Sequence, residues 1–527
     1  MSVNSIRNLI ERANRLSANK IALIDKDVKI TYKELYEKVN QIALYISALG
    51  LEKGSRVGIY SNKDYHKVIA ILAVLSTDYI FVPITRLLKA EQVDHIVKDC
   101  DIKCMITDEQ KLKVIEEINF DGTIITVQSC NKDIVSFEEI YKCYSKEYSC
   151  DIKGHDNAVI TYYDFGLDGL PKGVVITHRN LIDCARVVNS YLDIKKDDVI
   201  SGVLSFSFDY GLNQIFSALY ARATFVVHTM TLPTDFFTHL VRDKITVLPL
   251  MPIHITQMFD EDPRRLPKAE QLSNIRAITS SGGKITDSML AKVEERFVSS
   301  KFYYMHGLSE AFRSTYLAPT QLKIRPTSIG KAIPDVDLYI INEDGQECKP
   351  REVGELIHRG LGIYKGYWGR KIETDERFKS IKILDKVLDL PDSLTDEIVV
   401  ASGDFVYKDE EGYIYFVGRH DDMIKSSGYR FSPLEIENVV YNNFDSISKC
   451  AVFSIENELI EEEVVLVYSS LEEIGRNEIL MELKKHLPLY MLPKQVIYKY
   501  NIPLQSNNRD KIDKKALKDD IIKLTKH

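Results

Sequence analysis

Residues 163–174 read Y-D-F-G-L-D-G-L-P-K-G-V and lie between the apolar runs 158–162 and 175–177. Proteins cradle phosphate with glycine backbone N–H groups and a lysine, because both present positive charge to the anion. The loop supplies four residues of this kind: Gly166, Gly169, Lys172 and Gly173. It also carries Asp164 and Asp168, whose charge opposes a phosphate. The glycines and the lysine therefore indicate a phosphate site, and the two carboxylates argue against one.

On both sides of this loop, short apolar runs alternate with helical patterns. Thr31 and Glu34 have capping-box spacing ahead of a helix at 32–49, and Asp209 is expected to cap a helix at 209–220. Alternation of this kind predicts βαβ units and a mostly parallel sheet covered on both faces. The strands are expected at residues 56–60, 81–84, 104–107, 199–204, 223–228, 247–250, 277–279 and 301–305.

The pattern changes beyond residue 320. Shorter β segments at 337–341, 354–359 and 397–401 predict a small β subdomain, and a new α+β pattern starts after Asp421. We therefore expect an α/β protein with a large domain over residues 1–420 and a small, mobile α+β domain over 421–527. The lysine-rich end of the chain is expected to be a solvated helical tail.

Composition narrows the class of protein. The 527 residues are 45% hydrophobic and 28% charged with a net charge of -8, which fits a soluble enzyme of two or more domains. The negative charge argues against nucleic acid, and no apolar run has the length of a membrane span. Eight scattered cysteines without a C-x-x-C pair predict reduced thiols and a cytoplasmic protein. The first helix, at 5–16, is expected to pack on the domain; a targeting peptide is the alternative.

Further short motifs follow the glycine loop in a fixed order. They are G-x-x-E at 307–310, G-E-L at 354–356, S-G-D at 402–404, G-R-x-D…K-x-x-G-x-R at 418–430, and the late lysine Lys511. In number, order and spacing they resemble the AMP-forming adenylate-forming enzymes, which include acyl-CoA synthetases, luciferases and stand-alone adenylation enzymes. The resemblance implies that a carboxylate joins the α-phosphate of ATP, releasing pyrophosphate, before the acyl group passes to a thiol.

The first step of that reaction brings two anions together, so positive charge and oriented donors must do most of the catalytic work. The resemblance implies that Lys511 bridges the carboxylate and the α-phosphate, although Asp510 stands where the family usually has glycine. A surface lysine is the alternative for Lys511. Glu310 would bind Mg²⁺, and Ser309 a phosphate oxygen, since Mg²⁺ prefers carboxylate and phosphate ligands.

The resemblance also assigns the nucleoside contacts. His306 stands where the family usually has an aromatic ring beside adenine, and Asp404, helped by Arg419, would accept the ribose hydroxyls. The alternative for the last two is an exposed loop residue. Three glycines would let the backbone approach the nucleotide: Gly282, Gly283 and Gly307. Asp421 corresponds to the family's hinge, about which the small domain rotates between the two half-reactions.

The acid substrate is expected at the start of the helix 209–220. Asp209 would pair with the ammonium of an amino acid, and Tyr210 and Ser281 would line the same pocket. A helix cap at Asp209 and a non-amino carboxylic acid remain the alternatives. No carrier-type serine motif follows Leu517, so the acceptor is expected to be a separate carrier protein with a phosphopantetheine arm, or CoA.

A second hypothesis is an impaired family member that binds a ligand without adenylating it. The phosphate-loop hydroxyls expected from the resemblance are replaced by Asp164, Phe165, Leu167 and Asp168. A pair of like unit charges about 4 Å apart at an effective dielectric of about 20 costs about 4 kcal/mol. A bound Mg²⁺ would reverse the sign of that interaction.

Overall fold

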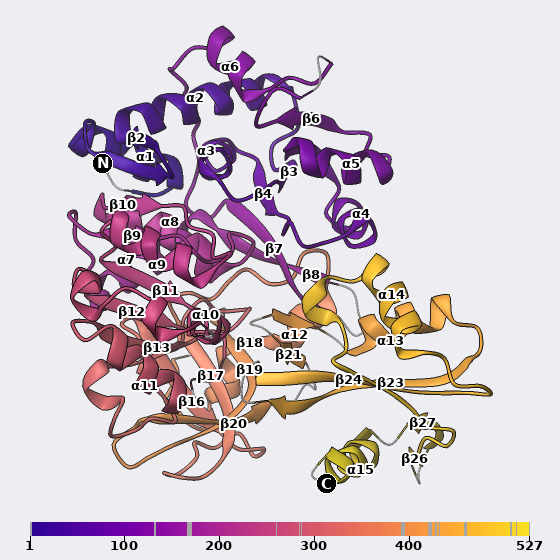
Figure 1. Cartoon of the computed structure of the whole chain (residues 1–527). Coiled ribbons are helices and arrows are strands. Elements are labelled where there is room, and N and C mark those ends of the chain that lie inside the picture. The colour runs from indigo at the N-terminus through magenta and orange to yellow at the C-terminus, as the bar shows by residue number, and fades with distance from the viewer. Residues whose placement is uncertain are drawn as a thin grey trace. The chain divides into compact units, whose positions relative to one another are not determined.

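The computed structural model describes residues 3–130, 133–165, 171–259, 261–283, 285, 287–391, 396–419, 424–426, 429–431, 433–457, 461–505, 508–512 and 514–525. The chain forms two compact units (Figure 1). The first contains Met1–Arg86, His95–Tyr162 and Lys172–His420, and the second contains Leu87–Asp94, Tyr163–Pro171 and Asp421–His527. The expected α/β class is confirmed. The domain boundary and the hinge at Asp421 stay predictions, because residues 420–423 lie outside the described part.

A 14-stranded sheet forms the centre of the first unit. Its order is β16-β17-β19-β20-β15-β14-β13-β12-β11-β9-β10-β1-β2, with β18 paired to β19. The strands from β13 to β1 are parallel to one another, and those from β14 to β16 are antiparallel. Their bounds are β1 Ile21–Asp25, β2 Val28–Thr31, β9 Val199–Ser201, β10 Thr224–Val226, β11 Val247–Leu250, β12 Ala277–Ser280, β13 Lys301–His306, β14 Thr315–Leu317, β15 Ser328–Ala332, β16 Val336–Ile341, β17 Gly354–Gly360, β18 Phe378–Ser380, β19 Ile398–Lys408 and β20 Ile414–Arg419.

The short β segments expected beyond residue 320 join this sheet through β14 and β15. A six-stranded sheet has the order β6-β5-β3-β4-β7-β8. Its strands are β3 Arg56–Tyr60, β4 Ile80–Pro83, β5 Ile102–Thr107, β6 Thr123–Thr126, β7 Asn157–Phe165 and β8 Pro171–Thr177. Side chains from β3, β4 and β5 are almost completely buried, as expected for parallel strands covered on both faces.

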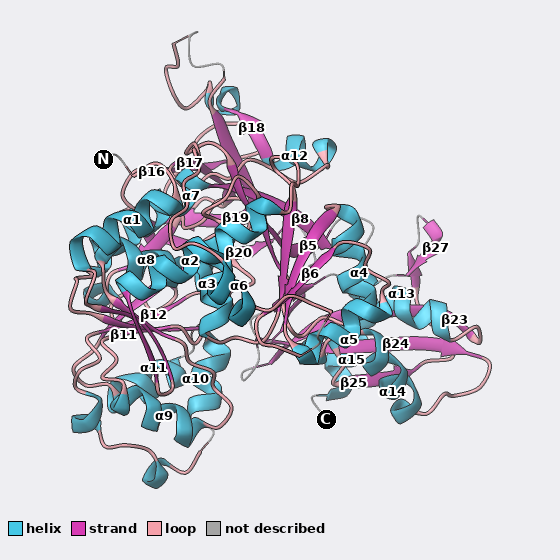
Figure 2. Cartoon of the chain, turned by 90° about the horizontal axis from the view of Figure 1, so that it is seen from above, coloured by secondary structure: helices cyan, strands magenta, loops and turns pink. Residues whose placement is uncertain are grey.

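Helices cover both faces of the parallel strands of the large sheet. Helices α9, α10 and α11 lie on one face of β11 and β12, and α1, α7 and α8 on the other (Figure 2). These helices are α1 Ile6–Ser17, α7 His178–Leu192, α8 Asp209–Ala221, α9 Pro233–Arg242, α10 Pro252–Met258 and α11 Asp287–Arg296. The remaining ones near the six-stranded sheet and β18 are α2 Tyr32–Ala48, α3 Tyr65–Val74, α4 Ala90–Asp99, α5 Glu109–Glu117, α6 Phe137–Cys143 and α12 Lys371–Arg377. No helix in the described part of the chain is long and apolar enough to span a membrane.

The predicted N-terminal cap is present in α2 and absent in α8. The predicted capping box of α2 is present, with Thr31 and Glu34 bonded to each other's backbone N–H groups. The predicted cap at Asp209 is wrong, because Phe208 occupies the N-cap position and makes no capping bond through its side chain. Asp209 is the first residue of α8, which leaves its carboxylate at the positive end of the helix.

The second unit is built on the long hairpin of β23 (Ile447–Asn457) and β24 (Glu461–Ser470), seen clearly in Figure 1. Apolar side chains alternate between its two faces, and each set joins a different buried cluster. Both faces are therefore covered. The other elements are β21 Ile424–Ser426, β22 Tyr429–Phe431, β25 Gln495–Tyr498, β26 Leu504–Gln505, β27 Asn508–Ile512, α13 Pro433–Asn443, α14 Arg476–His486 and α15 Lys514–Thr525.

The prediction of a solvated C-terminal tail is wrong. Leu517 and Ile521 of α15 are 0% and 1% exposed and pack against Ala451 and Val465 of the hairpin. The sequence signal for this packing was the spacing of the two residues, which places them on one face of a helix. The many lysines of this segment instead suggested an exposed helix.

We expect Leu517→Ala to lower the free energy of unfolding of the second unit by about 2–5 kcal/mol, since it removes a fully buried side chain. Hydrogen exchange of the β23 and β24 amides in the full chain measures this effect. Asp519→Ala, at an exposed position of the same helix, is the matched control and should leave exchange nearly unchanged. Equal exchange in the two variants would contradict the packing of α15.

Candidate active site

The predicted site residues gather at one edge of the large sheet. Strands β9, β11, β12 and β13 are parallel, so their carboxyl ends point to the same side. Asp209 opens the helix that follows β9, Ser281 follows β12 directly, and His306 is the last residue of β13. Ligands of open α/β sheets bind outside the carboxyl ends of the strands. The topology therefore brings together residues that lie up to about a hundred positions apart in the sequence.

His306 and Asp404 are joined by a hydrogen bond. The Nε2 atom of His306 lies 3.0 Å from Oδ2 of Asp404, whose side chain is completely buried. Asp404 lies on β19 opposite Arg419 of β20 in the strand register. The structure thus places side by side the residues expected at adenine and at ribose, and gives both a fixed orientation. The side chain of Arg419 lies outside the described residues, and its role stays a prediction.

Glu310 and Lys172 meet at one tyrosine that the sequence did not single out. The hydroxyl of Tyr367 donates a hydrogen bond to the carboxylate of Glu310, which is 5% exposed. The Nζ atom of Lys172 lies 4.3 Å from the centre of the Tyr367 ring. The backbone around Tyr367 is fixed on β8, where Trp368 N–H donates to the Gly173 carbonyl at 2.7 Å. A carboxylate and a cation on distant segments are therefore held around the same ring.

Glu310 is suited to a magnesium ion that is shared with a phosphate. Its carboxylate is a hard oxygen ligand, and the Tyr367 hydroxyl holds it in one orientation. Among the described residues, no group of three or more His, Cys, Asp or Glu side chains could hold a metal ion. A magnesium ion at Glu310 would thus take its other ligands from phosphate and water, as is usual for this ion.

The Asp209 carboxylate accepts two hydrogen bonds. Its Oδ1 accepts a hydrogen bond from the backbone N–H of Tyr210 at 2.7 Å, and the Tyr364 hydroxyl donates to Oδ2 at 3.4 Å. Lys63 fixes the segment between β9 and α8 by donating to three consecutive carbonyls at 2.9, 2.5 and 3.2 Å. Burial raises the pKa of the Asp209 carboxyl, and the nearby guanidinium of Arg313 acts in the opposite direction.

Arg313 is a buried cation that no motif of the sequence indicates. It is 4% exposed, and its Nη1 donates a hydrogen bond to Ser281 Oγ at 3.1 Å. Its guanidinium lies over the ring of Tyr210, 4.3 Å from the centre. Two residues predicted to bind substrate, Tyr210 and Ser281, thus have the same cation as neighbour. The only signal in the sequence was that Arg313 is the one charged residue between Glu310 and Lys323.

Two of the predicted glycines are required by the backbone. A Cβ atom at Gly307 would lie 2.1 Å from the carbonyl oxygen of Phe312, so only glycine fits at position 307, directly after β13. Gly282 has φ of +85°, a conformation that side chains disfavour. The Tyr304 hydroxyl donates to the carbonyl of Gly283 at 2.9 Å, which fixes the loop after β12.

Several predicted residues are not placed by the structure. Gly166, Gly169, Asp168 and Asp421 lie outside the described residues. Lys511 belongs to β27 of the second unit, where its backbone is described and its side chain is not. Ser309 is partly buried next to Glu310. The roles of all these residues stay predictions.

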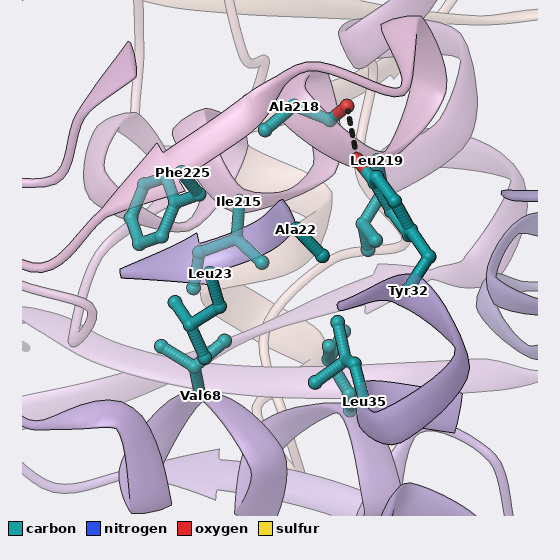
Figure 3. Close-up of a pocket in the computed structure, with 10 residues that line it drawn as sticks. Ala22, Leu23, Tyr32, Leu35, Val68, Ile215, Ala218, Leu219 and Phe225 are labelled. Atoms are coloured by element: carbon teal, nitrogen blue, oxygen red, sulfur yellow. Dashed lines mark hydrogen bonds between the residues drawn. The ribbon is translucent and has the colours of Figure 1, made fainter. Parts of the chain in front are cut away.

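A small cavity elsewhere in the first unit is not a substrate site. It lies between β1, α2, α3 and α8 and is lined by apolar side chains such as Leu23, Ile215 and Phe225 (Figure 3). It leaves about 10 Å³ for the centre of a water-sized molecule. The one polar side-chain group among the described lining residues, the Tyr32 hydroxyl, lies 2.6 Å from the Ala223 carbonyl oxygen and 3.3 Å from that of Ala218, so it is already hydrogen-bonded. The cavity is too small for a carboxylic acid and is a gap in the packing.

A protein-family profile and several curated sequences match most of this chain. A family profile described as AMP-binding enzyme matches residues 10–368. Tyrocidine synthase 1 of Brevibacillus parabrevis is 26% identical over 519 residues, covering 97% of this chain and 45% of that protein. Surfactin synthase subunit 1 of Bacillus subtilis (strain 168) is 26% identical over 520 residues, covering 97% of this chain and 14% of that protein. The chain thus spans less than half the length of these curated relatives.

Solved structures share the fold at low sequence identity. o-Succinylbenzoate CoA synthetase (MenE) of Bacillus subtilis has a TM-score of 0.82 at 22% identity, covering 97% of this chain and 98% of that one. An artificially fused Adenylation-PCP di-domain from Klebsiella oxytoca has a TM-score of 0.78 at 20% identity, covering 94% of each chain. The amide bond synthetase McbA of Marinactinospora thermotolerans has a TM-score of 0.84 at 17% identity, covering 97% and 99%. These matches establish the fold.

We expect Tyr367→Phe to weaken ATP·Mg²⁺ binding about 10-fold, because the buried Glu310 carboxylate loses its hydroxyl donor. Isothermal titration calorimetry measures the change. Tyr500→Phe, at a tyrosine that is 65% exposed in the second unit, is the matched control and should bind as the unchanged protein does. A Tyr367→Phe variant with unchanged affinity would show that Glu310 acts without this donor.

Proposed function

We propose that this chain, which belongs to the AMP-binding enzyme family, activates an amino acid as its acyl-adenylate and passes the acyl group to a thiol. Enzymes of this family use ATP with Mg²⁺ to activate an acid, and the proposal specifies the acid and the acceptor. The observation that carries the proposal is the gathering of Asp209, His306, Glu310 and Asp404 at one edge of the sheet. Each has a partner that holds it in place.

Asp209 supports an amino acid as the substrate. Its carboxylate is partly buried at the start of α8, and it is not used as a helix cap. A carboxylate in such a place is stable when a cation pairs with it, and the α-ammonium of an amino acid supplies one. With a non-amino carboxylic acid as substrate, Asp209 would have no ammonium partner, and its polar neighbours would be the Tyr364 hydroxyl and Arg313.

The first half-reaction joins two anions. An oxygen of the substrate carboxylate attacks the α-phosphorus of ATP, and the bond to pyrophosphate breaks. Lys511 is proposed to bridge the two negative groups, and Lys172 to bind the phosphates, since fixed positive charge lowers the barrier most where charge accumulates. Glu310 would hold Mg²⁺, which would supply positive charge to the phosphates. His306 and Asp404 orient the nucleoside.

The second half-reaction transfers the acyl group. A thiol loses its proton, its sulfur attacks the acyl carbon, and AMP leaves with the carboxylate oxygen. The relatives include a protein described as a CoA synthetase and a di-domain that contains a PCP, which supports either CoA or a carrier protein as the acceptor. We propose that the second unit turns about Asp421 so that Lys511 serves the first step only.

The impaired-enzyme hypothesis rests on the aspartates of the glycine loop. Asp168 lies outside the described residues, and the side chain of Asp164 is likewise not described. The same calorimetric titration separates the hypotheses. A protein whose loop repels phosphate would bind a carboxylic acid without binding ATP·Mg²⁺, whereas an active enzyme binds both.

Exchange of labelled pyrophosphate into ATP tests the proposed function directly. We expect acid-dependent exchange with at least one member of a panel of amino acids, aryl acids and alkyl acids. Lys511→Ala should lower that exchange about 100-fold or more, because the bridging charge is lost. Lys523→Ala, at an exposed lysine of α15, is the control and should leave exchange unchanged.

Two outcomes would contradict the account. Exchange that is absent with every acid would contradict the adenylating function. Exchange that survives in the Lys511→Ala variant would contradict the role given to that lysine.

A further inference from the structure

Arg313 has more hydrogen-bond donors than the protein satisfies. A guanidinium carries five N–H donors and keeps its charge in proteins. Its Nη1 donates to Ser281 Oγ at 3.1 Å, and the Tyr191 oxygen is a second acceptor beside the guanidinium. Nε is buried without a partner among the described residues. Buried polar atoms are almost always hydrogen-bonded, so an unpaired one points to a ligand. Here the residue is 4% exposed, which makes the missing partner costly.

Aromatic rings stabilise this cation without satisfying its donors. The guanidinium carbon lies 4.3 Å from the centre of the Tyr210 ring and 4.8 Å from that of the Phe312 ring. Cation–π contacts of this kind contribute about 0.5–2 kcal/mol through the ring face. They leave the edge of the guanidinium, where the N–H groups point, for an acceptor that binds in the same plane.

The neighbouring carboxylate of Asp209 does not accept a hydrogen bond from Arg313. Asp209 interacts electrostatically with Arg313, but no carboxylate among the described residues lies within 4.0 Å of the guanidinium. Asp209 instead accepts from Tyr210 N–H and the Tyr364 hydroxyl. The predicted substrate pocket thus contains a partly buried anion and a buried cation that are close but not paired. Removing either charge from water is favourable only with a good partner.

We propose that Arg313 binds a second acidic group of the substrate, so that the acid activated here carries an anionic group besides the carboxylate that reacts with ATP. A planar guanidinium matches the two oxygens of a carboxylate. An acidic amino acid would pair its ammonium with Asp209 and its side-chain carboxylate with Arg313. A dicarboxylic acid without an ammonium would use Arg313 alone. The inference rests on the proposed function and specifies its substrate class.

Matched pairs of acids test this inference. The pairs are glutamate and glutamine, aspartate and asparagine, and succinate and succinamate, which differ only in one charged group. Charge-assisted hydrogen bonds contribute about 1.5–3 kcal/mol, so the acidic member of at least one pair should have a kcat/KM in pyrophosphate exchange roughly 10- to 100-fold higher. A preference within the amino-acid pairs identifies an acidic amino acid, and one confined to succinate identifies a dicarboxylic acid.

Variants assign the preference to Arg313. Arg313→Gln should abolish it, mainly by raising KM for the acidic member, and Arg313→Lys should keep part of it. Arg186→Gln alters a partly exposed arginine that pairs with Asp335 and should leave the preference intact. Titration with ATP·Mg²⁺ checks that Arg313→Gln still folds, because only the folded protein binds the nucleotide.

Direct binding separates this inference from the proposed function. Calorimetric titration of the six compounds, with a non-hydrolysable ATP analogue present, needs no catalysis. Absence of exchange together with tighter binding of an acidic member would contradict the proposed function and support the role of Arg313. Equal binding within every pair, or a preference that Arg313→Gln retains, would overturn the inference. In that case Arg313 serves only to balance the charge of Asp209.

Discussion

The parallel pairing of β9, β11, β12 and β13 is the constraint on which the site depends. Parallel strands carry all their carboxyl ends to one edge, so the loops that follow them must meet there. Asp209 and Ser281 follow two of these strands and His306 ends a third, so the three residues share one location although they are far apart in the sequence. The antiparallel continuation through β19 then brings Asp404 to His306.

The site residues are held by partners that have no chemistry of their own in the reaction. Tyr367 orients Glu310, Tyr364 contacts Asp209, and Lys63 fixes the segment before α8. Such support matters because a site for two anions works through charges that are already in position when the substrates arrive. The family assignment gives the reaction, and the packing explains how a buried set of charges stays in place.

Much of the fold could be predicted from the sequence, because apolar periodicity determines it locally. The capping box at Thr31 and the alternation of strands and helices from Arg56 to His306 were correct. The cap at Asp209 was wrong because Phe208 occupies the N-cap position, and the solvated tail was wrong because α15 packs on a distant hairpin. Arg313 and Tyr367 escaped notice for the same reason: burial beside Tyr210 or Glu310 leaves no local pattern. The choice of acid likewise depends on contacts between distant residues, which leave no local pattern in the sequence.

Transfer of labelled oxygen from the acid tests the central claim most directly. The claim is that a carboxylate oxygen of the substrate attacks the α-phosphorus of ATP at the site built on Asp209, Glu310 and Asp404. With an acid labelled by ¹⁸O in its reacting carboxylate, an acceptor thiol and ATP·Mg²⁺, the account predicts one labelled oxygen in the AMP that is released. Label found in inorganic phosphate, with none in AMP, would contradict it.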